Sequence, residues 1–237
     1  MDFDYGVLFT SEAMTMLGKG LWFTLQLTVL ALIGGMLIGT PLAMMRLSSN
    51  RWLSGFAKLY VDFFRGLPLV QVLLVFYLMM PLVIQWVTGS QYPKPLGALV
   101  AGVITFAIFE AAYYSEIMRA GIQSISRGQQ SASYALGMSY GQTMAQVILP
   151  QALRNMLPVL LTQTIILFQD ITLVYAVGWK DFLGAGSTLA GINNRPTEFY
   201  VFVALVYFVI CYALSTYVKR LQKKIAIIRS IIERYTQ

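Results

Sequence analysis

The stretch LWFTLQLTVLALIGGMLIGTPLAMM, Leu21–Met45, decides the class of this protein, because it contains no charged residue. A helix needs about 20 mostly apolar residues to cross the roughly 30 Å hydrocarbon core of a bilayer. Four further apolar stretches of this length follow, and residues 56–64 could extend the second span. The four are Leu67–Val87, Leu96–Ile117, Met156–Val177 and Glu198–Val218. None shows the alternation of a transmembrane β-strand. The sequence therefore predicts an all-α integral membrane protein with five spans.

The composition of the 237-residue chain agrees with this class and excludes several kinds of chemistry. Apolar residues make up 57% and charged residues 11%, with a mean hydropathy of +0.66, whereas soluble domains carry roughly 25% charged residues. The chain has no histidine and one cysteine, Cys211. A Ser-His-Asp triad, a His-ligated metal site and an internal disulfide are therefore excluded. No phosphate-binding G-x-x-x-x-G-K-[ST] motif occurs, so any ATP that drives this protein must be bound by another chain.

The distribution of basic residues predicts the orientation in the membrane. One set of segments holds most of the 17 Lys and Arg residues: Arg46, Arg51, Lys58, Arg65, Arg119, Arg127, Arg154, Lys219, Arg220, Lys223, Lys224, Arg229 and Arg234. The opposite set holds Lys19, Lys94, Lys180 and Arg195. Cytoplasmic segments carry the excess of Lys and Arg, so we expect the N-terminus outside and the C-terminus in the cytoplasm. The net charge of +7 then favours a membrane over a nucleic acid as the partner. This assignment leaves no Lys or Arg in the middle of the membrane.

The chain divides into an extracytoplasmic segment (1–19), a transmembrane domain (20–218) and a basic cytoplasmic tail (219–237). The first apolar run is too long for a cleavable signal peptide and follows acidic residues. The tail intersperses basic residues with Ile225, Ile227, Ile228, Ile231 and Ile232. This pattern is typical of an amphipathic helix on the anionic inner leaflet. A plain extension of the last span with a solvated face explains it equally well.

The long cytoplasmic loop, residues 118–155, contains the most specific local signals. Residues 129–136 suit a short helix, which Gly137 would end in the left-handed conformation. Ser139 and Gln142 form a capping box that opens a second helix, and Pro150 falls near the end of that helix. We therefore predict a helix–turn–helix knuckle, whose small residues Ala132, Ser133 and Ala135 would suit a groove on another protein. Surface helices that merely rest on the membrane are the alternative.

The spacing from Gly137 to Leu149-Pro150 resembles the coupling loop of the permease subunits of bacterial ABC importers. The Glu-Ala-Ala of that pattern falls on Ser131-Ala132-Ser133, so two of its three positions differ, and Val147 stands where the pattern has Ile. Other stretches resemble the polar amino acid permeases and are close to the glutamate/aspartate importer permeases. These stretches are FRGLPL (64–69), FEAAYYSEIMRAGIQSISRG (109–128), ILPQALR (148–154), LLTQ (160–163) and FQDITL (168–173).

The resemblance implies a five-span type I ABC importer permease fold in the bacterial inner membrane. It also implies the import of amino acids, with glutamate and aspartate as the substrates. Another polar amino acid (glutamine, histidine or arginine) is the alternative substrate. The implied partners are a second permease subunit, homologous or identical, two ABC ATPase subunits, an extracytoplasmic amino-acid-binding protein and membrane lipid. ATP and Mg would be bound by the ATPases. The implied ATPase-coupling residues are Ser131, Ala132, Ser133, Gly137, Leu149 and Pro150.

Two carboxylates inside the predicted spans require an explanation, because a charge at the bilayer centre disfavours insertion by about 2.5–3.5 kcal/mol. Asp170 lies about 22 Å from the inner end of the fourth span and Glu110 about 21 Å from the outer end of the third. We predict that a row of polar residues lines the translocation path: Glu110, Tyr113, Gln163, Gln169, Asp170 and Thr172. Interhelical hydrogen bonds that serve packing alone are the alternative.

Two other classes of protein fit the sequence less well. An ATP-independent secondary carrier would need its coupling-ion site and its repeats within one chain, and five spans show no internal repeat. A membrane-embedded enzyme would need a catalytic motif, and none joins the available side chains. We therefore expect a transport subunit that is not itself an enzyme.

Overall fold

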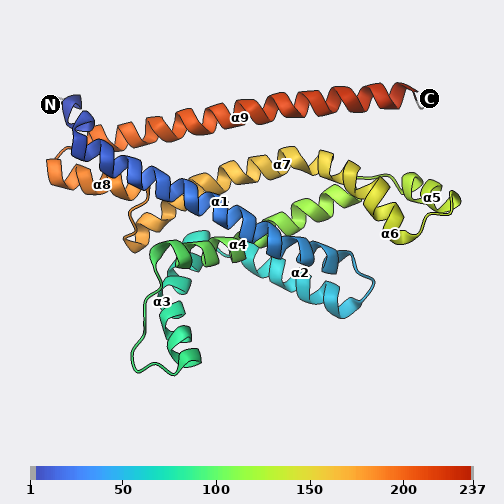
Figure 1. Cartoon of the computed structure of the whole chain (residues 1–237), viewed down its shortest axis with the longest axis horizontal. Coiled ribbons are helices and arrows are strands. Elements are labelled where there is room, and N and C mark those ends of the chain that lie inside the picture. Colours follow the sequence, from blue (N-terminus) through green and yellow to red (C-terminus); the bar gives the residue numbers. More distant parts are fainter. Residues whose placement is uncertain (1–3, 236–237) are drawn as a thin grey trace.

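The structure is a computed structural model that describes residues 4–235, with side chains described up to Ile225. Over these residues it contains helices and no strand (Figure 1). The helices are η1 (Tyr5–Phe9), α1 (Ser11–Leu47), α2 (Arg51–Arg65), α3 (Leu69–Thr88), α4 (Ala98–Gln123), α5 (Arg127–Ala135), α6 (Tyr140–Gln142), η2 (Thr143–Ile148), α7 (Leu149–Asp170), η3 (Ile171–Val177), α8 (Phe182–Asn193) and α9 (Pro196–Tyr235).

Five helices of the described chain are long and apolar enough to cross a membrane, as predicted. They are α1, α3, α4, the continuous helical run Tyr140–Val177 and α9 as far as Ile225. The largest difference in bounds concerns the fourth span, which the apolar pattern begins at Met156. Its helix starts at Tyr140 because the second helix of the long loop runs into the span without a break.

Residues 56–64 do not extend the second span but belong to a separate helix, α2. The segment Gly66-Leu67-Pro68 separates α2 from α3, since a proline disfavours the helical conformation of the residue before it. The helix α2 runs back along α1 and α4, with Ala57 and Val61 fully buried. The hydroxyl of Tyr60 donates a hydrogen bond to the carbonyl of Ile108 on α4 at 2.6 Å. The second half of α2 therefore lies beside the middle of α4 and not at the end of α4 that leads into the long loop.

The largest helix–helix interface joins α1 to α4, and glycines on α1 make it possible. A Cβ on Gly39 would lie 2.9 Å from the carbonyl oxygen of Ala111, and one on Gly35 would lie 2.9 Å from the ring of Tyr114. Both distances are shorter than a side chain tolerates. The spacing of Gly35 and Gly39 is a small-xxx-small pattern, which lets two membrane helices approach closely. Here it serves packing within one chain.

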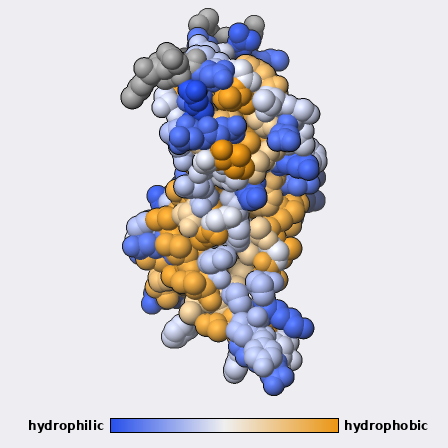
Figure 2. All heavy atoms as spheres, turned by 90° about the vertical axis from the view of Figure 1, so that its left-hand side faces the viewer, coloured by the Kyte–Doolittle hydropathy of each residue, from blue (hydrophilic) through white to orange (hydrophobic). Residues whose placement is uncertain are grey.

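The molecule has two distinct ends (Figure 1). The N-terminus and α8 lie at one end, called the N-terminal end below, and α5, α6 and the end of α9 lie at the other, the loop end. The helix α3 leaves the bundle as an arm. Figure 2 looks onto the N-terminal end and shows hydrophobic side chains over the flanks, with hydrophilic ones gathered at the top and at the tip of the arm. Hydrophobic flanks of this kind suit the hydrocarbon core of a bilayer.

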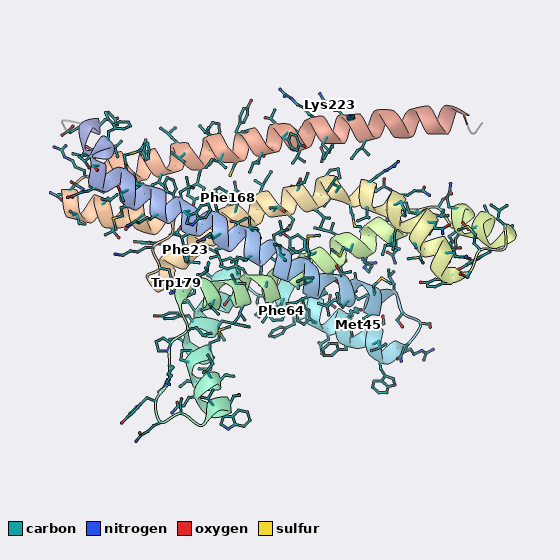
Figure 3. The ribbon with its side chains drawn as sticks, in the orientation of Figure 1. Phe23, Met45, Phe64, Phe168, Trp179 and Lys223 are labelled. Carbon is teal, nitrogen blue, oxygen red and sulfur yellow. The ribbon has the colours of Figure 1, made fainter. Side chains whose placement is uncertain are left out.

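The last span and the tail form one unbroken helix, α9, of 40 residues. The basic residues Lys219, Arg220, Lys223 and Lys224 are exposed on it, and Lys223 points away from the bundle (Figure 3). The backbone of the tail thus continues the span. The apolar side chains on which the amphipathic interpretation of the tail depends, from Ile227 onward, lie outside the described side chains.

Candidate functional site

The first feature of the candidate site is a helix–turn–helix at the loop end, which we call the knuckle (residues 127–150). The helix α5 ends in a Schellman motif, in which the N–H of Gly137 donates to the carbonyl of Tyr134 at 2.9 Å and the N–H of Met138 to that of Ser133 at 3.1 Å. Gly137 has φ 77°. This left-handed conformation favours glycine. The predicted turn at Gly137 is confirmed.

The second arm of the knuckle begins with the predicted capping box. The N–H of Gln142 donates to Ser139 Oγ at 3.3 Å, and the N–H of Ser139 donates to Gln142 Oε1 at 2.8 Å. The prediction that this helix ends near Pro150 is wrong, because Pro150 lies in the first turn of α7. A proline lacks the N–H of the regular ladder and crowds the preceding turn. The chain widens into the π-helical segment η2 immediately before it, which lets the helix continue.

The knuckle exposes apolar side chains to solvent at its tip. Leu136 is 82% exposed and Tyr140 is 61% exposed. Of the candidate coupling residues, Ser131, Ala132, Gly137 and Pro150 are exposed and Leu149 is partly buried. Ser133 differs from the expectation that it lies on the outer surface: it is buried and donates to the carbonyl of Gln129 at 2.8 Å. Its face of α5 packs against η2.

The second feature is a group of polar residues inside the bundle. Glu110 on α4 is fully buried, and both of its carboxylate oxygens accept from Gln163 Nε2 on α7, at 3.3 and 3.0 Å. This interhelical hydrogen bond joins two of the predicted path residues, and it is also the kind of contact that the packing alternative describes. Gly35 on α1 covers the pair, since a side chain there would lie 3.1 Å from Glu110 Cβ. In the isolated chain Glu110 therefore holds Gln163 in place and is sealed from the surface.

Arg65 joins this group, which the sequence did not indicate. Its guanidinium carbon lies 5.6 Å from the ring centroid of Tyr113 on α4, a cation–π arrangement. The sequence grouped Arg65 with the cytoplasmic segments, whereas in the structure it lies beside a residue in the middle part of α4. Arg65 is the last residue of α2, and it is carried about 21 Å back from the start of that helix because α2 folds along the bundle. Phe64 beside it packs into the core between α2 and α4 (Figure 3). The apolar run 56–64 directly before Arg65 was the available signal.

Asp170 and its neighbours lie further toward the N-terminal end. Asp170, seven residues beyond Gln163, is displaced by about 10 Å along the helix axis. It is partly buried and interacts electrostatically with Tyr113 and Glu110. Gln169 is exposed, and the hydroxyl of Thr172 donates to the Gln169 carbonyl at 2.8 Å within the same helical run. Tyr113 thus has one positively charged neighbour, Arg65, and one acidic residue, Asp170, within electrostatic range.

Asp181 is fully buried at the start of α8. Its two carboxylate oxygens accept from the backbone N–H groups of Gly184 at 2.8 Å and Leu183 at 3.1 Å. Burial raises the pKa of Asp181 to about 6, although these two hydrogen bonds oppose the shift. The next residue, Phe182, donates its N–H to Thr24 on α1 at 3.1 Å. Asp181 therefore caps the start of α8, and the neighbouring Phe182 joins that start to α1.

Comparison with known proteins agrees with this geometry. The family described as binding-protein-dependent transport system inner membrane component matches residues 31–227. The glutamate/aspartate import permease protein GltK of Escherichia coli O6:H1 is 51% identical over 207 residues, which cover 87% of this chain and 92% of GltK. The arginine transport system permease protein ArtQ of Bacillus subtilis is 31% identical over 207 residues, covering 87% of this chain and 91% of ArtQ.

Solved structures share the fold. The crystal structure of an amino acid ABC transporter with histidines contains a chain that is 31% identical, with a TM-score of 0.82 over 94% of this chain and 100% of that one. An inward-facing MetNI methionine ABC transporter has a TM-score of 0.74 at 21% identity, over 91% of this chain and 99% of that one, and supports the fold alone. The five-span fold, the family match and the relatives agree. This chain belongs to the binding-protein-dependent inner membrane components, the permease subunits of ABC importers.

Proposed function

We propose that this permease imports glutamate and aspartate and that Arg65 recognises a carboxylate of the substrate. The observation that carries the proposal is the guanidinium of Arg65 above Tyr113, on the side of α4 that also meets Asp170. The 51% identity to GltK, whose name gives glutamate and aspartate as its substrates, supports the same substrate class.

The charges suit an acidic amino acid. Such a substrate carries two carboxylates and one ammonium group, so carboxylates alone would repel it. Arg65 supplies a planar fork of donors that matches a carboxylate. Asp170 can accept the ammonium group, while Gln163 is oriented by Glu110. Gln169 and Thr172 complete the row of path residues, although the Thr172 hydroxyl bonds within its own helical run.

The proposed assembly contains a second permease subunit, homologous or identical, two ABC ATPase subunits and an extracytoplasmic binding protein. ATP and Mg would be held by the ATPases, which dock on Ser131, Ala132, Ser133, Gly137, Leu149 and Pro150. The exposed Leu136 and Tyr140 at the tip of the knuckle support a docking surface, because large apolar side chains favour burial against a partner. Ser133 is buried and would contribute by holding α5 in place against η2.

A different polar amino acid is the second candidate for the substrate. Relatives at 31–32% identity include a probable glutamine permease, GlnM, and the arginine permease ArtQ, both of Bacillus subtilis. A cationic substrate would be repelled by Arg65. Glutamine retains an α-carboxylate that Arg65 could bind, so uptake of glutamine is the informative comparison. Membership in the ABC importer family sets the ATP-independent carrier aside.

The test is uptake by the complex that copurifies through this subunit, reconstituted in vesicles with its binding protein. Arg65→Gln removes the cation and keeps hydrogen-bonding capacity. We expect glutamate and aspartate uptake to fall by about tenfold or more, the size expected for a lost charge-assisted hydrogen bond. ATP hydrolysis stimulated by the binding protein should persist. Arg65→Lys keeps the charge without the fork and should fall between the two.

Arg51→Gln is the matched control, since Arg51 is exposed at the opposite end of the same helix. It should transport as wild type does. Equal glutamate uptake by Arg65→Gln and wild type would refute the role of Arg65. Uptake of glutamine but not of glutamate by the wild-type complex would refute the acidic substrate.

A further inference from the structure

We infer that Glu116 is a positioning residue for coupling. It joins α1 to the base of the knuckle, the end of α4 and the first turns of α7. Movement of the docked ATPases would then reach α1 as well as α4 and α7. The inference rests on the proposed docking of the ATPases on the knuckle. It assigns a role to charged residues at the base that lie outside both the docking surface and the polar row.

The carboxylate of Glu116 lies between two guanidinium groups on different helices. One oxygen is ion-paired with Arg46 on α1. The other accepts from Arg119 on α4, with Nη2 at 2.8 Å and Nε at 3.3 Å. Glu116 and Arg119 are spaced i and i+3 on one helix, a spacing at which such pairs form locally. The ion pair with Arg46 adds a connection between helices that 70 residues of chain separate.

This connection continues to the point where the knuckle leaves α4. Arg119 Nη1 donates to Gln123 Oε1 at 2.6 Å, and Gln123 is the last residue of α4. Charge-assisted hydrogen bonds thus lead from α1, through Glu116 and Arg119, to the start of the long loop. Such bonds are about twice as strong as bonds between neutral groups.

The two roots of the knuckle, by which we mean the end of α4 and the first turns of α7, are fixed to each other. Asn155 Nδ2 on α7 donates to Ser124 Oγ, directly after α4, at 2.8 Å. One turn earlier, Gly121 packs against Met156, where a Cβ would lie 3.0 Å from Met156 Cβ. The chain leaves α4 and returns on α7 within this contact. A displacement of the knuckle must therefore move α4 and α7 together.

Apolar packing beside Glu116 joins the same three helices. Tyr114 and Met118 on α4, Met156 and Leu160 on α7, and Ala43 on α1 form one buried cluster. This cluster opposes separation of the three helices. It does little to fix the register of one helix along another, because apolar contacts are non-directional. The pairing of Glu116 with Arg46 and Arg119 fixes the register of α1 against α4. Side-chain exposures of 14% for Arg46 and 19% for Glu116 shield the pair from most of the solvent.

The test measures how much ATP is hydrolysed for each substrate molecule imported, using the reconstituted complex with its binding protein. Glu116→Gln removes the charge at nearly constant shape. We expect the ATPases to remain bound and stimulated, and the ATP consumed per substrate to rise about five- to tenfold, in the range of typical coupling between distant sites. Arg46→Gln should give the same phenotype. Arg154→Gln, an exposed arginine beside the second root, should leave the ratio unchanged.

The double exchange Arg46→Glu with Glu116→Arg keeps one carboxylate between guanidinium groups and should restore the ratio toward that of wild type. A wild-type ratio in Glu116→Gln would overturn the inference. The inference would also be overturned if the double exchange restored the amount of folded complex but not the ratio of ATP hydrolysed to substrate imported. Glu116 would then have only a structural role. Gly137→Val strains the knuckle itself and separates the two proposals. If this variant retains bound ATPases, the docking proposal fails. If only Glu116→Gln behaves as wild type, with a normal ratio of ATP to substrate, the role of Glu116 alone is refuted.

Discussion

Glu110 and Arg65 show two ways in which a charged side chain can exist beside lipid. Glu110 is withdrawn from the surface and meets its hydrogen-bonding needs through Gln163. Arg65 stays exposed on the isolated chain and rests on the ring of Tyr113. The first arrangement satisfies a carboxylate within one subunit. The second leaves donors free, as a group that binds a passing carboxylate must.

Asp181 provides a prediction about pH. Its pKa is raised to about 6 from the ordinary 3.8 by burial, so the folded state disfavours the charged form. The contribution to stability is fully present below about pH 4 and is lost as the pH rises through 6, with a magnitude on the order of 2 kcal/mol. Asp181→Asn removes this dependence. We expect the variant to be less stable than wild type at pH 4.5 and at least as stable at pH 8, measured as thermal unfolding in detergent by tryptophan fluorescence.

The comparison needs a carboxylate outside the core. Glu12 is exposed in the first turn of α1, so Glu12→Gln should unfold with the pH dependence of wild type. Asparagine remains a good residue at the start of a helix, and one acceptor oxygen can still serve Gly184 or Leu183. If Asp181→Asn and wild type lost stability in parallel between pH 4.5 and pH 8, burial of Asp181 would not be the cause.

At the scale of a single element, the knuckle depends on one backbone conformation. Gly137 has φ 77°, and a Cβ there would meet no atom within 4 Å. Gly137→Val therefore acts through strain alone and should cost about 1–3 kcal/mol. Because this strain falls on the turn between α5 and α6, we expect the variant to lose the ATPases during copurification while the permease remains in the membrane. Densitometry of the ATPase relative to the permease measures the loss.

Gly89 allows a matched comparison within the same chain. It ends α3 with φ 64°, and a Cβ there also meets nothing within 4 Å. Gly89→Val carries similar backbone strain at the tip of the arm, away from the knuckle. It should keep the ATPases bound. Loss of the ATPases from both variants would point to general destabilisation and not to the knuckle.

The elements that the sequence could predict are those whose signals are local. Apolar length located five spans, the left-handed glycine located the turn, and the pair Ser139 and Gln142 located a helix start. The helix α2 was missed as a separate element because it exposes large apolar side chains, among them Phe56, Leu59 and Phe63. Pro150 was misjudged because the cost of a proline depends on whether the preceding turn can widen, which η2 does. The ion pair of Glu116 with Arg46 depends on tertiary contact, and no local pattern encodes it.

At the scale of the whole molecule, the polar row indicates that one chain is incomplete. Arg65 and Gln169 are exposed and Asp170 is partly exposed on the isolated chain. In a bilayer these groups would meet hydrocarbon, where unpaired polar groups cost several kcal/mol. A second permease subunit packed over this face would turn an exposed polar surface into a lined path. The placement of these three residues thus gives the proposed second permease subunit a physical reason.

The orientation of the molecule is the last prediction, and the single cysteine makes it testable. Cys211 is buried, so wild type should react weakly with a membrane-impermeant maleimide. Gln91→Cys and Ser126→Cys each add an exposed thiol, the first between α3 and α4 and the second before α5. The excess of Lys and Arg at the loop end predicts that this end faces the cytoplasm. In cells whose outer envelope is permeabilised and whose inner membrane is intact, the thiol of Gln91→Cys should be labelled. The thiol of Ser126→Cys should be labelled only after the inner membrane is opened. The opposite pattern would place the knuckle outside, where no ATPase could reach it, and would contradict the coupling proposal together with the orientation.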